Sequence, residues 1–181
     1  MLKIYLTDLA AYNKGYLLGE WITLPCDDLE SKLNKILSSG EALCFVESGY
    51  FEKHEEYFIT DWEWEDNELF KLTEYENIFE LNSKLTEVSN LDEESINIVA
   101  FLLNQGLACD IDDAISKKDD VVIYYNSSMQ TLAYDLIEEC YDLNTLPSII
   151  SNHIDYESIA RDLMLEGNYF EIDGDIYEYR N

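Results

Sequence analysis

Few side chains in this sequence have the types and spacing that catalysis requires. The chain has two histidines, His54 and His153, and it contains no G-x-S-x-G motif, no C-x-x-C motif and no glycine-rich phosphate-binding loop. We interpret both histidines as solvated or helix-capping residues. Carboxylate pairs can serve a hydrolase, but among 39 acidic residues such pairs must occur by chance. The sequence therefore predicts a protein that is not an enzyme and needs no cofactor.

Two aspartate clusters superficially resemble calcium ligands. One is Cys109–Asp113 and the other is Asp173–Asp175. Neither fits the twelve-residue calcium-binding loop, because the glycine and the closing glutamate do not stand at the required offsets. Asp173 and Gly174 are instead the preferred residue pair for a tight hairpin turn. We expect no metal site.

The cysteines and the apolar segments indicate where the protein resides. Cys26, Cys44, Cys109 and Cys140 are scattered in or beside apolar runs, which favours reduced core cysteines over a disulfide or zinc framework. No segment approaches the roughly 18 consecutive apolar residues of a membrane span. The first residues alternate like a strand and lack the features of a signal peptide. These observations predict a cytoplasmic protein.

Negative charge is the most informative property of the chain. The 181 residues include 39 acidic and 11 basic side chains, for a net charge of −28. Direct binding to nucleic acid or to an anionic membrane is excluded, because phosphate contacts need lysine and arginine. The hydrophobic fraction of 47% is too high for a disordered acidic tail. Since a soluble domain needs a net charge of only about 2 to 8 in magnitude, solubility alone does not explain this excess.

The densest acidic pattern falls on one predicted helix. Its carboxylates recur at spacings of three and four residues, and we expect them to lie opposite the apolar residues Leu132 and Leu136. No lysine or arginine occurs in residues 119–160 to relieve their repulsion. This acidic stripe comprises Asp135, Glu138, Glu139 and Asp142.

Dense carboxylates with few cations produce a field similar to that of DNA. Duplex DNA carries about one negative charge per 1.7 Å of its axis, so 28 net charges correspond to roughly 48 Å of duplex. A rigid acidic protein of this kind can occupy a basic DNA channel. Charge alone leaves another hypothesis open, namely an acidic antagonist or chaperone of some other basic DNA-binding protein.

Periodicity predicts a mixed α+β chain. Strands are expected at residues 2–6, 43–46, 56–60, 121–125, 169–172 and 175–179. Helices are expected at residues 26–37, 76–88, 96–103, 129–140 and 155–165. We expect Ser39-Gly40 to end the first helix and Asn90–Glu93 to cap the start of the third. The remaining segments are interpreted as loops.

Several motifs in a fixed order resemble those of the ArdA antirestriction family. Ile4–Gly15 followed by Gly19–Trp21 is similar to the start of that family, and Glu55–Glu63 resembles its central E-x-x-I-x-D-aromatic-E passage. Ile154–Leu163 resembles the family's I-D-Y-x-x-x-A-R-D-L motif. Leu136–Pro147 falls where the family carries its antirestriction motif. The resemblance extends over nearly the whole chain.

This resemblance implies an elongated homodimer that mimics bent B-form DNA. The expected domains are an N-terminal α+β domain at 1–75 with a small antiparallel sheet and a helix, a helical domain at 76–108, and a C-terminal α+β domain at 109–181 with a three-stranded sheet and helices. The implied partner is a type I restriction–modification enzyme, specifically its DNA-specificity and methyltransferase core. The resemblance implies inhibition of restriction and often of modification. Family members travel on conjugative mobile elements.

The expected functional residues form two sets. The first is the DNA-mimic acidic surface, which comprises Asp61, Glu63, Glu65, Asp66, Glu68, Glu74, Glu76, Glu80, Glu93, Glu94, Asp110, Asp112, Asp113, Asp119, Asp120, Asp135, Glu138, Glu139 and Asp142. The second is the dimer interface, implied by the position of the antirestriction motif, which comprises Leu136, Cys140, Leu143, Leu146, Pro147 and Ile150.

Overall fold

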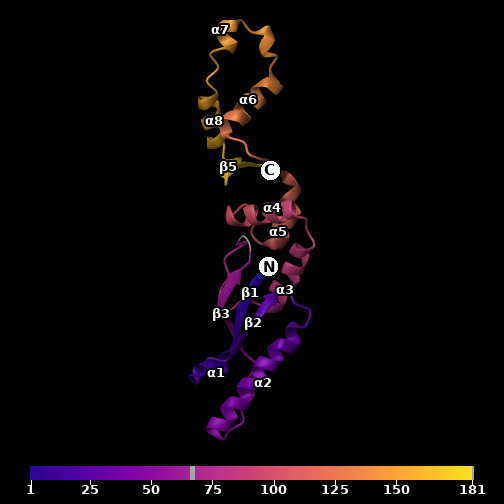
Figure 1. Cartoon of the computed structure of the whole chain (residues 1–181), viewed down its shortest axis with the longest axis vertical. Helices are drawn as coiled ribbons and strands as arrows, with labels where there is room; N and C mark the ends of the chain where they lie inside the picture. The colour runs from indigo at the N-terminus through magenta and orange to yellow at the C-terminus, as the bar shows by residue number, and fades with distance from the viewer. Residues whose placement is uncertain (66–67, 181) are drawn as a thin grey trace. The chain divides into compact units, whose positions relative to one another are not determined.

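The computed structural model describes residues 1–65 and 68–180 (Figure 1). In these ranges the chain forms eight α-helices and two three-stranded antiparallel sheets, which confirms the predicted α+β class. The chain divides into two compact units, Met1–Ser116 and Lys117–Asn181. The division into three domains and the homodimer stay predictions.

The first unit is built on a sheet with β1 (Leu2–Asp8) at its centre. β2 (Gly19–Leu24) and β3 (Tyr57–Trp64) flank it, and both run antiparallel to it. Alternate residues of β1 face the core, so that Leu2, Ile4 and Leu6 are fully buried. The strands predicted near β1 and β3 are therefore confirmed. β2 was not among the predicted strands.

Helix α2 (Leu29–Ser48) contradicts two predictions. It continues through Ser39-Gly40, which was expected to end it, and it includes residues 43–46, which were expected to form a strand. Gly40 and Cys44 are buried one turn apart on the core-facing side, so they extend the helical pattern instead of breaking it. The helix ends at Gly49, whose left-handed φ of 71° closes the last turn through its N–H to the Phe45 carbonyl.

Four further helices complete the first unit. They are α1 (Leu9–Asn13), α3 (Ile78–Ser89), α4 (Glu93–Asn104) and α5 (Ile111–Lys117). Asp92 caps α4 by accepting the Ser95 N–H, as its position in the sequence predicts. Residues 98–102 of α4 are all buried, so this helix, which was predicted at residues 96–103, has apolar neighbours on several sides. Neither α1 nor α5 was predicted.

The second unit combines a sheet with helices. Its elements are the 3-10 helix η1 (Lys118–Asp120), β4 (Val121–Tyr124), α6 (Met129–Cys140), the 3-10 helix η2 (Leu143–Thr145), α7 (Ser148–Ser151), α8 (Tyr156–Leu165), β5 (Tyr169–Ile172) and β6 (Asp175–Tyr179). β6 is the central strand, between β4 and β5. Asp173 and Gly174 have φ values of 52° and 90°, as a tight two-residue hairpin requires, so the predicted hairpin is confirmed. Leu132, Ala133 and Ile176 form the centre of this unit's core.

None of the helices in the described residues is both long enough and apolar enough to cross a membrane.

Candidate acidic surface

The most acidic helix, α6, is fixed by its start and its apolar side. Ser128 caps it by accepting the N–H of Thr131 at 3.1 Å. Met129, Leu132 and Ala133 are buried and share a core with Ala160 on α8. α6 and α8 therefore pack together, and the remaining side of α6 faces solvent.

Asp135, Glu138 and Glu139 on α6 are all exposed, but they do not lie opposite the apolar residues. Together with Leu132 and Leu136 they line a hollow of about 410 Å³. At 3.6 residues per turn, positions 132 and 135 are only about 60° apart around the helix axis. The predicted opposition is therefore wrong, and the carboxylates border an apolar floor.

Asp142 does not lie on α6 with the other three acids of the predicted stripe. α6 ends at Cys140, and Tyr141 has an extended backbone with φ of −133°. Asp142 then caps η2 by accepting the N–H of Asn144 at 3.1 Å. Its carboxylate is exposed, as expected, but it stands on a different element from the other three acids.

The three α6 carboxylates keep their negative charge uncompensated. Within the described residues, no lysine, arginine or histidine forms an ion pair with Asp135, Glu138 or Glu139. Glu138 accepts a hydrogen bond from the Tyr134 hydroxyl at 2.6 Å, and this bond raises the pKa of Tyr134. A tyrosine donor leaves the carboxylate charged, so α6 presents three negative charges to solvent.

The other acids of the predicted surface are mostly exposed as well. Glu76 and Asp113 are the half-buried exceptions, and Asp66 lies outside the described residues. Glu76 accepts hydrogen bonds from the N–H and hydroxyl of Thr73, and Asp113 accepts one from the Cys109 N–H. These two carboxylates serve local structure. The exposed acids are Asp61, Glu63, Glu65, Glu68, Glu74, Glu80, Glu93, Glu94, Asp110, Asp112, Asp119 and Asp120.

Most lysines of the first unit form ion pairs with nearby acids. Lys84 illustrates this, because it lies 3.2 Å from Glu80 and 3.6 Å from Asp112, and its hydrogen bond to Glu80 raises its pKa. The other pairs include Lys3–Glu65, Lys14–Glu52, Lys32–Asp28, Lys35–Glu20 and Lys53–Glu55. These pairs leave few positive charges to attract an anion such as nucleic acid.

His54 is not a solvated residue, so its interpretation from the sequence is wrong. Its ring and the Asp8 carboxyl group are both completely buried, and Nδ1 lies 2.5 Å from Oδ2. A Cβ atom on Gly40 would lie 1.9 Å from that same Oδ2 atom. Glycine at this helical position is therefore what allows α2 to approach the pair. His153 is exposed, in agreement with its interpretation.

A second polar cluster that the sequence did not predict lies on the sheet of the second unit. Glu178 accepts hydrogen bonds from Tyr124 at 2.8 Å, Tyr169 at 3.2 Å and Arg180 at 2.7 Å. Burial raises the pKa of Glu178, but the donors outweigh burial and hold that pKa below its usual range. A lowered pKa is the opposite of what a carboxyl general acid requires. We interpret this cluster as structural.

The residues predicted for the dimer interface lie in the second half of α6 and in the segment that follows it. Leu136 and Leu143 are half-buried, whereas Cys140, Leu146, Pro147 and Ile150 are exposed. The exposure of Cys140, like that of Cys109, contradicts its prediction as a core cysteine. Two further exposed residues of this region are Tyr141, directly after α6, and Ile149 on α7, at 62% and 74% exposure.

Within the described residues, no group of three or more histidine, cysteine, aspartate or glutamate side chains could hold a metal ion.

Comparison with known proteins identifies a family to which nearly the whole chain is similar. The model of the family described as "Antirestriction protein (ArdA)" matches residues 4–178. No curated protein matches the chain significantly.

Proposed function

Because the chain belongs to the ArdA antirestriction family, we propose that it inhibits type I restriction–modification enzymes by occupying their DNA-binding groove as an acidic DNA mimic. The family membership implies antirestriction activity and an inhibitor instead of an enzyme. The proposal adds the mechanism and the target. It also places the action in the cytoplasm, where restriction enzymes meet incoming DNA, and it includes inhibition of modification.

The observation that carries the mechanism is the uncompensated charge on α6. Asp135, Glu138 and Glu139 are exposed on one rigid helix and have no cationic partner among the described residues. Like charges at these spacings repel, which makes an isolated helix less stable. A basic groove relieves that repulsion and releases the bound counterions, as it does for DNA. Contact with a cationic partner would therefore relieve the repulsion among these three carboxylates.

The hollow beside these carboxylates suits the side chains of such a partner. Leu132 and Leu136 form an apolar floor that can contact the aliphatic part of an arginine or lysine. The bordering carboxylates can then accept hydrogen bonds from its charged end. Arginine and lysine are the residues that line DNA-binding grooves.

A homodimer is part of the proposal. Ile149 and Ile150 are 74% and 52% exposed, and isoleucine of this exposure in a contiguous apolar segment is typical of an interaction surface. We infer that this segment, with Leu146 and Pro147, pairs with the same segment of a second copy. A dimer would double the negatively charged length offered to the enzyme.

The test is displacement of labelled duplex DNA from a purified type I restriction–modification enzyme, measured at two salt concentrations. We expect stoichiometric displacement that weakens as salt rises, since exposed charges are screened. Failure to displace DNA at low salt would contradict the mechanism. Equal binding to histone-like proteins would favour the alternative, an antagonist of other basic DNA-binding proteins.

Two charge-matched variants locate the contact. The first is Asp135→Asn with Glu138→Gln and Glu139→Gln, which neutralises the α6 carboxylates. The control is Glu20→Gln with Glu52→Gln and Glu55→Gln, which removes three acids that already pair with lysines. Both lose three negative charges, but we expect the α6 variant to inhibit about tenfold more weakly and the control to change less. Equal effects would mean that only net charge matters.

A further inference from the structure

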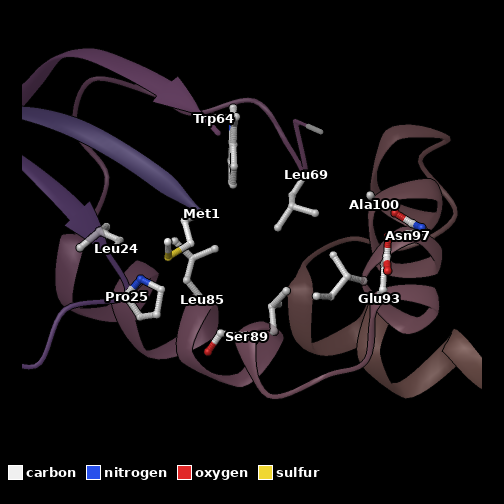
Figure 2. Close-up of a pocket in the computed structure, with 12 residues that line it drawn as sticks. Met1, Leu24, Pro25, Trp64, Leu69, Leu85, Ser89, Glu93, Asn97 and Ala100 are labelled. Carbon is white, nitrogen blue, oxygen red and sulfur yellow. The ribbon is translucent and has the colours of Figure 1, made fainter. Parts of the chain in front are cut away.

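One face of the sheet in the first unit is open to solvent. Alternate residues of β1 point to the other face, which packs against helices α2 and α3. Figure 2 shows Leu24 of β2 and Trp64 of β3 on that covered side, in the wall of a cavity that α3 and α4 also line. On the open face, Tyr5 of β1 pairs with Trp21 of β2 and with Asp61 of β3. These three side chains therefore form one row across the sheet, in which Trp21 and Asp61 are exposed and Tyr5 is half-buried.

Tyr5 and Trp21 form an aromatic corner on this open face. Their ring centroids lie 5.4 Å apart and their planes meet at 72°. The Tyr5 hydroxyl donates to the Gly19 carbonyl at 3.1 Å, and a Cβ atom on Gly19 would lie only 2.7 Å from the Tyr5 ring. Gly19 therefore leaves the room that the ring occupies, and the hydrogen bond holds the ring there. Trp21 remains 48% exposed, so the corner is accessible to a partner.

The carboxylates beside the aromatic corner determine which charge it attracts. Asp61 accepts the Trp62 N–H at 2.9 Å, and no lysine, arginine or histidine of the described residues forms an ion pair with it. In the next row of the sheet Lys3 pairs with Glu63, and its ammonium group lies 3.0 Å from Glu65. The carboxylates of Asp61, Glu63 and Glu65 outnumber Lys3, so this part of the face is negatively charged. It therefore attracts cations and repels anions.

An aromatic corner beside a carboxylate suits one kind of side chain. The faces of tryptophan and tyrosine rings attract cations. Arginine fits better than lysine, because its planar guanidinium stacks on a ring, is less strongly hydrated than an ammonium group and bonds a carboxylate with two N–H groups. Asp61 is on the strand next to Tyr5, and neighbouring strands are about 4.8 Å apart. A guanidinium on the Tyr5 ring therefore lies within reach of the Asp61 carboxylate.

We propose that Tyr5, Trp21 and Asp61 bind an arginine side chain of a basic partner protein. The guanidinium plane lies on the aromatic corner and its N–H groups point toward Asp61. Duplex DNA presents phosphates at its outer surface and keeps its aromatic bases stacked inside, so mimicry of DNA charge does not supply this contact. The site does not depend on the proposed inhibition of restriction enzymes.

The experiment compares two blocked tetrapeptides of equal charge, acetyl-Gly-Arg-Arg-Gly-amide and acetyl-Gly-Lys-Lys-Gly-amide. Each is titrated at low salt into the ¹⁵N-labelled full-length protein, and the indole N–H resonances of the three tryptophans are followed. We expect the arginine peptide to move the Trp21 resonance saturably and to bind about two- to fivefold more tightly than the lysine peptide. Trp62 and Trp64 should move little, because they pair with Ile4 and Leu2 on the covered face.

Two tryptophan variants test the aromatic part of the site. Trp21→Leu removes the ring but keeps an apolar side chain, and we expect it to bind the arginine peptide about two- to fivefold more weakly. Trp62→Leu, on the covered face, is the control and should keep the native affinity. The backbone amide resonances of Tyr5 and Asp61 report binding in both variants.

Two charge variants test the carboxylate. Asp61→Asn removes the charge but keeps an oxygen that can accept the Trp62 N–H, and we expect it to weaken binding of the arginine peptide about two- to fivefold. Glu87→Gln, at an exposed residue of α3, removes the same charge away from the open face. This control should change the affinity less.

The proposal is overturned if the arginine peptide saturates the protein without moving the Trp21 resonance, or if the lysine peptide binds equally well. It is also overturned if Trp21→Leu and Trp62→Leu bind the arginine peptide with the same affinity, because charge alone would then hold the peptide. Should circular dichroism show that Trp21→Leu fails to fold, Asp61→Asn and Glu87→Gln still decide the question. The test contains no restriction enzyme, so its failure is distinguishable from failure of the DNA displacement experiment.

Discussion

The Nδ1 atom of His54 lies 2.5 Å from the Oδ2 atom of Asp8, in a pair from which solvent is completely excluded. The other carboxylate oxygen of Asp8 accepts the Ala11 N–H at 3.0 Å and so caps α1. The His54 N–H in turn donates to Glu41 on α2 at 3.0 Å. One aspartate therefore joins the end of β1, the start of α1 and the segment that precedes β3. α2 lies against this junction at Gly40.

Gly40→Ala should destabilise the protein, although alanine is normally the better helix former. The added Cβ would lie 1.9 Å from Asp8 Oδ2 and 3.0 Å from His54 Nδ1, so the buried pair or the helix must move. Overpacking of this kind costs roughly 1–3 kcal/mol, which exceeds the gain in helix propensity of about 1 kcal/mol. Urea unfolding monitored by circular dichroism measures the change.

Ser39→Ala is the matched control for that substitution. Ser39 stands next to Gly40 on the same helix but is exposed, and its hydroxyl donates to the Lys35 carbonyl one turn earlier. We expect the free energy of unfolding of the Ser39→Ala variant to stay within about 0.5 kcal/mol of that of the native protein. If Gly40→Ala were equally harmless, the close approach of α2 to the pair would not matter for stability.

His54→Ala should cost more than the loss of a surface contact. It leaves the buried Asp8 carboxyl group without its side-chain partner, and removal of one member of a buried pair typically costs about 3–5 kcal/mol. In a double-mutant cycle with Asp8→Asn, which keeps an acceptor for the Ala11 N–H, the two effects should be non-additive by about 0.5–3 kcal/mol. Additive losses in urea unfolding would show that the two side chains do not stabilise each other.

Elements defined by local signals could be predicted from the sequence. The limits of α6, the Asp155 cap of α8 and the Asp173-Gly174 hairpin follow from residues within one helical turn or one strand pair. Predictions failed where distant residues decide the structure. Gly40 has the local character of a helix stop, but its partners Asp8 and His54 come from other elements. The sequence alone shows neither of those contacts.

The candidate site was predictable in composition but not in geometry. Exposure of the acids follows from the cost of burying charge, and almost all the described ones are exposed. Which carboxylates share a surface depends on where a helix ends, and α6 ends at Cys140, before Asp142. The Glu178 cluster was missed because only the pairing of β4 and β5 with β6 brings Tyr124 and Tyr169 to Glu178.

Tyr169 should make stability fall in strong alkali. Burial and the negative charge of Glu178 raise the pKa of Tyr169 from 10 to about 12. The unfolded chain therefore releases this proton at a lower pH than the folded chain, and the stabilisation that is complete below pH 10 is lost as pH rises to about 12. Urea midpoints measured between pH 9 and 12 report the decline.

Tyr169→Phe should make that decline shallower, because phenylalanine has no proton to release. The control is Tyr141→Phe, which removes a tyrosine that is 62% exposed and makes no contact with Glu178. We expect the control to follow the native pH dependence. If both variants followed it equally, the raised pKa of Tyr169 would make no contribution to the loss of stability in alkali.

Ile149→Ser combined with Ile150→Ser should weaken self-association without unfolding the protomer. Both side chains are largely exposed within one chain, so their loss removes little from its core, whereas burial between two copies would contribute about 1.5–3 kcal/mol per isoleucine. Sedimentation velocity should therefore show a dimer dissociation constant at least tenfold higher.

Val46→Ser, at a residue that is 76% exposed on α2, is the control and should leave association unchanged. A double isoleucine variant that associates as tightly as the native chain would place the dimer interface elsewhere. If that variant is monomeric and still displaces DNA from the restriction enzyme as well as the native protein does, one protomer suffices for inhibition.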